Sequence, residues 1–98
     1  MGTKVGDRVG AILSVKDNTV MFLGYGVYVG DEVPHESIPG VFAGMMRENQ
    51  IKNPRICLDS GKSVYGFECW WGDEARVKDK LKDQNVILVD IYQIRVEG

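Results

Sequence analysis

The sequence has few of the residues that build metal centres or covalent cross-links, with one histidine and two cysteines among 98 residues. Both cysteines lie in the segment Asn53–Gly72, which is predicted below to form a β-hairpin. That hairpin would place Cys57 opposite Val64 or Tyr65, so Cys69 lies too far along its strand to bridge to Cys57. A lone histidine and two cysteines without ligand spacing do not favour a zinc site. We therefore expect two reduced thiols, no metal and no cofactor, as is usual in a cytoplasmic protein.

Positive charge is not in excess either: 12 Lys and Arg stand against 14 Asp and Glu, and the net charge is −2. A protein that binds a polynucleotide needs a clustered excess of cations, so the composition argues against DNA or RNA as a partner. One small anionic ligand needs only two or three local cations and is compatible with this balance. No apolar run approaches the length of a membrane span, so we expect no membrane partner and a cytoplasmic location.

Catalytic motifs are missing as well. The sequence contains no Walker-type phosphate loop and no nucleophile elbow. The single histidine, His35, lies in an acidic loop, where we expect it to be exposed to solvent. The spacing of the carboxylates does not pair them for acid–base chemistry. We predict that the protein is not an enzyme.

What the sequence does have is apolar residues in patterns typical of strands. A hydrophobic content of 44% supports one core, so residues 1–98 are predicted to form a single domain. Alternation predicts a first strand over Arg8–Val15, a polar turn at Lys16–Asn18 and a second strand over Thr19–Val29. In that second strand the odd-numbered residues from Met21 to Val29 are all apolar and are expected to form the core face.

The segment Asn53–Gly72 is predicted to be the centre of the fold. Two apolar runs, Arg55–Leu58 and Ser63–Trp71, flank the turn Asp59–Lys62, in which Gly61 can adopt a positive φ angle at no steric cost. This pattern predicts a β-hairpin.

Two helices and a last strand complete the prediction. Apolar residues at helical spacing predict a short helix over Ser37–Glu48, with Ser37 as its cap. A second helix is expected to begin at Asp73 and to end at Asn85 in a left-handed conformation. Val86–Val96 is the predicted last strand, and its apolar start is typical of a strand covered on both faces.

The resulting fold class is α+β. The segment Val5-Gly6-Asp7-Arg8-Val9 resembles the start of the first strand of SH3-like barrels. We expect a small, strongly curved antiparallel sheet or an SH3-like β-barrel of about five strands. A short helix is expected between the second and third strands, and one further helix in the C-terminal half.

Two alternating glycines, Gly24 and Gly26, interrupt the second strand and need a reason, because glycine in a strand costs roughly 0.5–1 kcal/mol relative to alanine. Bending of the sheet, or a bulge, is one explanation. Close approach of another backbone or of a flat ligand is the other.

Recognition chemistry is the remaining signal. Aromatic side chains concentrate on two predicted strands, and aromatic faces stack on nucleobases at about 1–3 kcal/mol per base. Cations in the preceding loop and backbone N–H groups near the glycines can contact phosphates. A half-buried Glu68 needs donors, either from an internal arginine or from the exocyclic amine of a base. The candidate ligand-binding residues are Tyr25, Tyr28, Trp70, Trp71, Glu68, Arg47, Lys52, Arg55, Gly24 and Gly26. Equally, the tryptophans can fill the core and a subunit interface.

The segments Gly24-Tyr25-Gly26-Val27-Tyr28 and Glu68-Cys69-Trp70-Trp71-Gly72 resemble small proteins of unassigned function encoded by bacterial viruses. Some phage proteins of this size are anti-defence sponges, which sequester cyclic nucleotide immune signals in oligomers without cleaving them. The resemblance implies a phage or prophage protein that acts in the host cytoplasm. It also implies a homo-oligomer, with ligand sites of aromatic and basic residues near a subunit boundary.

Two functional hypotheses follow. The first is a non-catalytic oligomeric protein that sequesters a small anionic nucleotide signal. The alternative is an SH3-like protein–protein interaction module, such as an inhibitor of a host protein, in which the same aromatic patch docks a partner chain.

Overall fold

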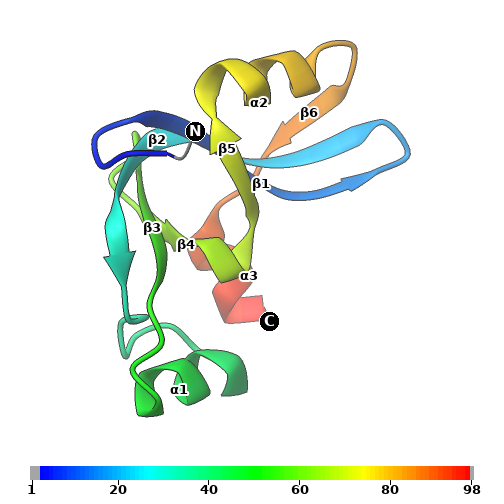
Figure 1. Cartoon of the computed structure of the whole chain (residues 1–98). Helices are drawn as coiled ribbons and strands as arrows, with labels where there is room; N and C mark the ends of the chain where they lie inside the picture. Colours follow the sequence, from blue (N-terminus) through cyan, green and yellow to red (C-terminus); the bar gives the residue numbers. More distant parts are fainter. Residues whose placement is uncertain (1–2, 98) are drawn as a thin grey trace.

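A computed structural model describes residues 3–97 of the chain. Within this range there are six strands, three α-helices and one 3-10 turn (Figure 1). Five strands form a curved antiparallel sheet in the order β4-β3-β2-β1-β5, and β6 pairs in parallel with the start of β2. The α+β class and the antiparallel sheet are therefore confirmed, but the sheet stays open and does not form the SH3-like barrel that was the alternative. The strands are β1 (Arg8–Lys16), β2 (Thr19–Glu32), β3 (Asn53–Leu58), β4 (Ser63–Tyr65), β5 (Trp70–Asp73) and β6 (Asn85–Leu88).

The hairpin of β1 and β2 forms as predicted. Asp17 and Asn18 connect the two strands with φ angles of 50° and 64°, the left-handed pair that a tight two-residue hairpin turn requires. The prediction that odd-numbered residues of β2 form the core face is wrong, because Val20 and Phe22 are buried whereas Val29 is exposed. The register between β1 and β2 shifts twice and that between β2 and β3 once, and each bulge changes the face to which the following residues point.

The two glycines of β2 have different structural reasons. Gly24 has a φ angle of +133°, which side chains rarely allow, and it lies beside the first register shift. At Gly26 a Cβ atom would lie 2.3 Å from the carbonyl oxygen of Cys57. Bending therefore explains Gly24, and the close approach of the β3 backbone explains Gly26.

The predicted hairpin around Gly61 is confirmed in its first half only. Gly61 has a φ angle of +93° in the turn, and Cys57 lies opposite Ser63 instead of Val64 or Tyr65. The long strand predicted over Ser63–Trp71 is wrong. The chain leaves β4 after Tyr65, makes a 3-10 turn over Gly66–Glu68 and crosses to pair with β1 as β5. Any side chain at Gly66 would crowd Pro54 and Trp71, so glycine permits this turn.

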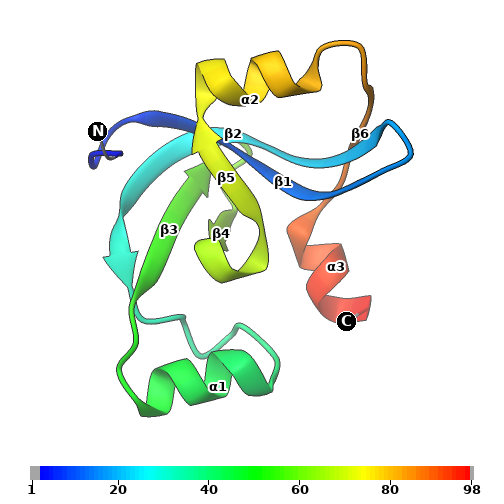
Figure 2. The same cartoon turned by 45° about the vertical axis from the view of Figure 1, so that its right-hand side comes forward.

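The helices differ from the prediction at their ends. Helix α1 (Val41–Glu48) begins four residues after Ser37, which bonds to His35 instead of capping the helix. Helix α2 (Glu74–Leu81) follows Asp73 as predicted, but the left-handed residue after it is Asp83, not Asn85. Figure 2 shows α2 at one end of the sheet, and α1 and α3 toward the other.

The predicted last strand, Val86–Val96, is wrong. The chain forms the short strand β6 and then helix α3 (Ile91–Glu97). The Asp90 carboxylate accepts a hydrogen bond from the Tyr92 N–H at 2.9 Å and so caps the helix. The apolar residues of β6 were expected to be covered on both faces, yet Val86, Ile87 and Leu88 are exposed.

Three apolar clusters hold these elements together. The largest joins β1, β2, β3 and β4 to α3 through Ile91, the second packs Val77 of α2 against β1 and β2, and the third fixes α1 through Ala43. Of the helices within residues 3–97, none has the length and apolar character needed to cross a membrane.

Candidate ligand-binding groove

The predicted aromatic residues do not gather on one face. Tyr28 stacks on Trp71 with ring centroids 5.5 Å apart, whereas Tyr25 packs edge-on against Phe22 in the second cluster. Trp70 lies on the face of β5 opposite to Trp71 and is 41% exposed, with the Lys80 ammonium 5.1 Å from its ring centroid. Most of these rings therefore already use their faces within the chain.

Glu68 finds its partner internally. Its carboxylate accepts hydrogen bonds from Arg95 at 2.6 and 2.8 Å and from the Tyr65 backbone N–H at 3.0 Å. The two side chains are 10% and 13% exposed. This ion pair fixes α3 against the 3-10 turn, and it supplies the donors that a carboxylate in this position requires.

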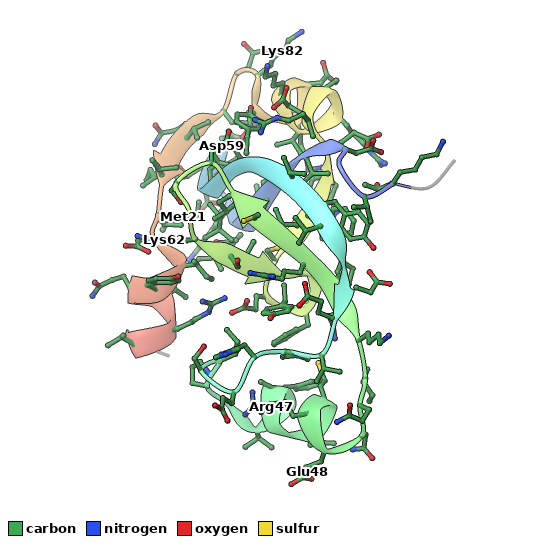
Figure 3. All side chains as sticks on the ribbon, turned by 90° about the vertical axis from the view of Figure 1, so that its left-hand side faces the viewer. Met21, Arg47, Glu48, Asp59, Lys62 and Lys82 are labelled. Carbon is green, nitrogen blue, oxygen red and sulfur yellow. The ribbon has the colours of Figure 1, made fainter. Side chains whose placement is uncertain are left out.

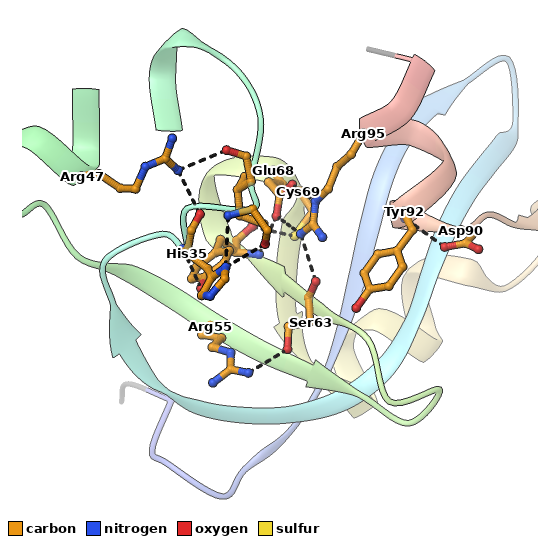
Figure 4. Close-up of polar contacts among 12 residues, drawn as sticks. His35, Arg47, Arg55, Ser63, Glu68, Cys69, Asp90, Tyr92 and Arg95 are labelled. Carbon is orange, nitrogen blue, oxygen red and sulfur yellow. Dashed lines mark hydrogen bonds and ion pairs between the residues drawn. The ribbon is translucent and has the colours of Figure 1, made fainter. Parts of the chain in front are cut away.

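A groove lies between the loop 33–39 and α3, with β3 and β4 as its floor. Its inner part has a volume of about 260 Å³, and it shares Ser37, Tyr92 and Arg95 with a wider outer part of about 590 Å³. Figure 4 shows the polar side chains that meet here. The polar residues lining the inner part are Glu32, His35, Ser37, Arg55, Ser63, Tyr65, Tyr92 and Arg95.

Two guanidinium groups converge on Ser63 in the floor of the groove. Arg55 donates to the Ser63 hydroxyl at 3.1 Å, and Arg95 donates to the Ser63 carbonyl oxygen at 3.0 Å. Arg55 also pairs with Glu32 at 3.1 Å, and hydrogen bonding to that carboxylate raises the pKa of Arg55. Neighbouring strands thus place Arg55 and Ser63, while α3 brings Arg95 to them.

The opposite wall of the groove is held by α1. Arg47 donates to the carbonyl oxygens of His35 at 2.9 Å and of Ile38 at 3.1 Å. The His35 N–H in turn donates to the Tyr65 hydroxyl at 3.2 Å. Arg47 therefore positions the loop and does not line the groove itself.

His35 presents a donor to the groove. Its Nδ1 atom accepts the Ser37 N–H at 3.1 Å and lies 2.8 Å from the Ser37 hydroxyl. Since Nδ1 is an acceptor, the proton of the neutral ring is on Nε2. Because His35 lines the groove, this Nε2–H can serve as a donor to a ligand there.

The lining is rich in hydrogen-bond donors, and its two guanidinium groups are each paired with one carboxylate, Arg55 with Glu32 and Arg95 with Glu68. Two guanidinium groups, an imidazole N–H and several hydroxyls face Glu32, the single carboxylate among the described lining residues. Such a set suits an anion with several acceptor oxygens. No group of three His, Cys, Asp or Glu residues in the described part of the chain is placed to hold a metal ion.

The structure brings few of the sequence-predicted residues to this groove. Arg55 lines it, whereas Arg47 and Glu68 hold its walls. The remaining candidates lie elsewhere: Tyr25, Tyr28, Trp70, Trp71, Lys52, Gly24 and Gly26. Sequence reasoning missed Tyr92 and Arg95, although Asp90 as a cap and the three-residue spacing of Ile91 and Ile94 are signals of a helix that would carry both on one side.

Comparison of the chain with protein families, with curated proteins and with solved structures finds no match. The geometry of the groove is therefore the only basis for a function.

Proposed function

We propose that the protein is a non-catalytic binding protein that sequesters a small anionic ligand of the nucleotide type in this groove. The observation that carries the proposal is the convergence of Arg55 and Arg95 on Ser63, in a chain whose net charge is −2. Phosphate oxygens would bind between Arg55 and the His35 Nε2–H. A base would stack on Tyr92, a half-exposed ring that Arg95 and Lys62 already approach at 5.6 and 5.1 Å from its centroid.

The proposal keeps the biological setting expected from the sequence. The protein would be a phage-encoded homo-oligomer that acts as an anti-defence sponge for a cyclic nucleotide in the host cytoplasm. The exposed apolar side chains of β6 support self-association.

Equilibrium dialysis against a panel of cyclic di- and trinucleotides tests the proposal. We expect one of these probes to bind, and to be recovered intact after the protein is denatured. Arg55→Ala should weaken binding by roughly 10- to 100-fold, the effect of losing one charged hydrogen-bonding group. Recovery of hydrolysed products would contradict the non-catalytic assignment.

Two control variants separate the groove from other sites. Lys52→Ala removes the same charge from an exposed side chain outside the groove, and Trp70→Ala removes the exposed ring on β5. Both should bind the probe as the unmodified protein does. Equal losses in Arg55→Ala and Lys52→Ala, or a loss in Trp70→Ala alone, would place the ligand elsewhere.

The second candidate, a protein–protein interaction module, is favoured by helix α1. Val41, Phe42 and Met45 are exposed on it, with Phe42 70% exposed, while Ala43 and Met46 face the core. An exposed apolar face on a helix is typical of a docking surface. If no nucleotide binds and a purified host protein binds with an affinity that Phe42→Asp abolishes, this alternative replaces the first.

A further inference from the structure

A second cleft, of about 420 Å³, lies where β2 changes its pairing partner. Residues Thr19–Phe22 of β2 pair with β6, and the residues from Gly26 onward pair with β3. The stretch between them, around Gly24, is therefore covered by neither strand on that side. Leu23, Leu58 and Ile91 are buried in the main core and line this cleft, so its floor is apolar.

The rim of the cleft carries an exposed apolar side chain and three charged side chains, Asp59, Lys62 and Asp90. Leu88, the last residue of β6, is 74% exposed. Lys62 in the β3–β4 turn and Asp90 before α3 form an ion pair at 2.6 Å, and Asp59 in the same turn is paired with Arg8 at 2.7 Å. Figure 3 shows Lys62 and Asp59 on the turn.

We infer that this face is the two-fold interface between two copies of the chain, in which Leu88 of each copy enters the cleft of the other. The inference rests on the oligomeric part of the proposed function and not on its ligand. A two-fold interface must be complementary to itself. Here an exposed apolar side chain and an apolar cleft lie side by side on one surface, so rotation about a two-fold axis can place each against the other.

The charges on the rim favour a second copy over a different partner. The charged side chains that line the cleft are Asp59, Lys62 and Asp90. A rim that carries both signs is complementary to itself, because the same rotation brings Lys62 of one copy toward the partner's Asp90. A foreign partner that is basic or acidic would gain from charges of only one sign. Covering β6 would also remove an apolar edge strand from solvent, which folded proteins generally avoid exposing.

Sedimentation velocity over a series of protein concentrations tests the inference. We expect the unmodified chain to form a dimer and Leu88→Asp to raise the dimer dissociation constant by roughly 30-fold or more, as for one buried interface anchor. Phe42→Asp is the matched control, because it places the same charge on an equally exposed apolar position of α1. It should leave the dimer intact.

A charge exchange gives an independent test. Lys62→Asp makes the rim wholly negative, and Asp90→Lys leaves two cations beside Asp59, so each variant alone should be monomeric. An equimolar mixture of the two should form a heterodimer. Asp90→Lys also removes the cap of α3, so circular dichroism should first show that this variant is folded. If it is not, Asp90→Asn is mixed with Lys62→Asp in its place, and weaker formation of the heterodimer is expected.

Three results would overturn the inference: a monomer at every concentration, a dimer that Leu88→Asp does not change, or a dimer that Phe42→Asp dissociates. The nucleotide probe separates this outcome from the ligand proposal. Leu88→Asp should bind the probe as a monomer, whereas Arg55→Ala should lose the probe and remain a dimer.

Discussion

Glycine is required at Gly26 by the distance between two strands. A Cβ atom there would lie 2.3 Å from the Cys57 carbonyl oxygen and 2.8 Å from the Leu58 Cα atom, both backbone atoms of β3. Backbone atoms cannot move aside without separating the strands. We expect Gly26→Ala to lower the free energy of unfolding by about 2–3 kcal/mol in urea denaturation.

Gly44 provides the matched control within the same protein. It lies inside α1, and the nearest atom to a Cβ placed there is the Arg47 Nη2 atom at 3.9 Å. Gly44→Ala should therefore raise the free energy of unfolding by about 0.5–1 kcal/mol, the difference in helix propensity. If Gly26→Ala behaves in the same way as Gly44→Ala, close approach of β3 is not the reason for the glycine.

The two cysteines should differ in reactivity. Burial raises the pKa of the Cys69 thiol to about 12, and the neighbouring Glu68 carboxylate acts in the same direction. The thiolate is the reactive form, so Cys69 should stay protonated and unmodified by iodoacetamide at neutral and mildly alkaline pH. Mass spectrometry should find Cys57 modified first in the folded protein and both thiols modified in urea. Modification of Cys69 at the rate of Cys57 in the folded state would contradict this.

At the scale of the elements, α3 depends on the Glu68–Arg95 ion pair. Arg95→Met would leave a carboxylate that is 10% exposed without its cation, at a cost of about 3 kcal/mol of unfolding free energy. In a double-mutant cycle with Glu68→Gln, the coupling between the two residues should be about 1–3 kcal/mol. Urea denaturation of the four proteins measures both quantities, and additive effects of the two substitutions would show that the pair does not hold α3.

Prediction at this scale succeeded where the signal was local. The turn at Asp17–Asn18, the turn at Gly61 and the start of α2 each depend on residues that are adjacent in sequence. It failed for Ser63–Trp71, because nothing local to that run says that the chain must break after Tyr65 to reach β1. It failed again for Val86–Val96, where apolar content favoured a strand although Asp90 can cap a helix.

The candidate site was predicted only in part, because it too combines residues with a local signal and residues that meet only through tertiary contacts. Arg55 was identified because it lies beside the hairpin, but the groove also needs Arg95 and His35, which are 60 residues apart in sequence. Their meeting depends on α3 packing against the main core and on Arg47 holding the loop. Asp90, Ile91 and Ile94 are local signals of the helix itself, but nothing near them in the sequence specifies that it packs beside the loop.

For the molecule as a whole, self-association should appear in thermal stability. If folding is coupled to dimer formation, the melting temperature of the unmodified chain rises with protein concentration. Differential scanning calorimetry over a concentration series should show this rise, and should show none for Leu88→Asp. A melting temperature that rises equally for Leu88→Asp would mean that β6 does not form the interface.

The sequence alone determined the fold class, α+β, and it lacks both the cation excess of a polynucleotide binder and the motifs of common enzymes. Composition and short-range periodicity carry that information because they depend on which residues can be buried and which turns they allow. Tertiary structure decided where the chemistry lies. Bulges changed which face of β2 is buried, the 3-10 turn allowed β5 to pair at the edge of the sheet opposite to β4, and α3 brought Arg95 to Ser63. These contacts join residues distant in sequence, and their free energy comes from packing that no local pattern encodes.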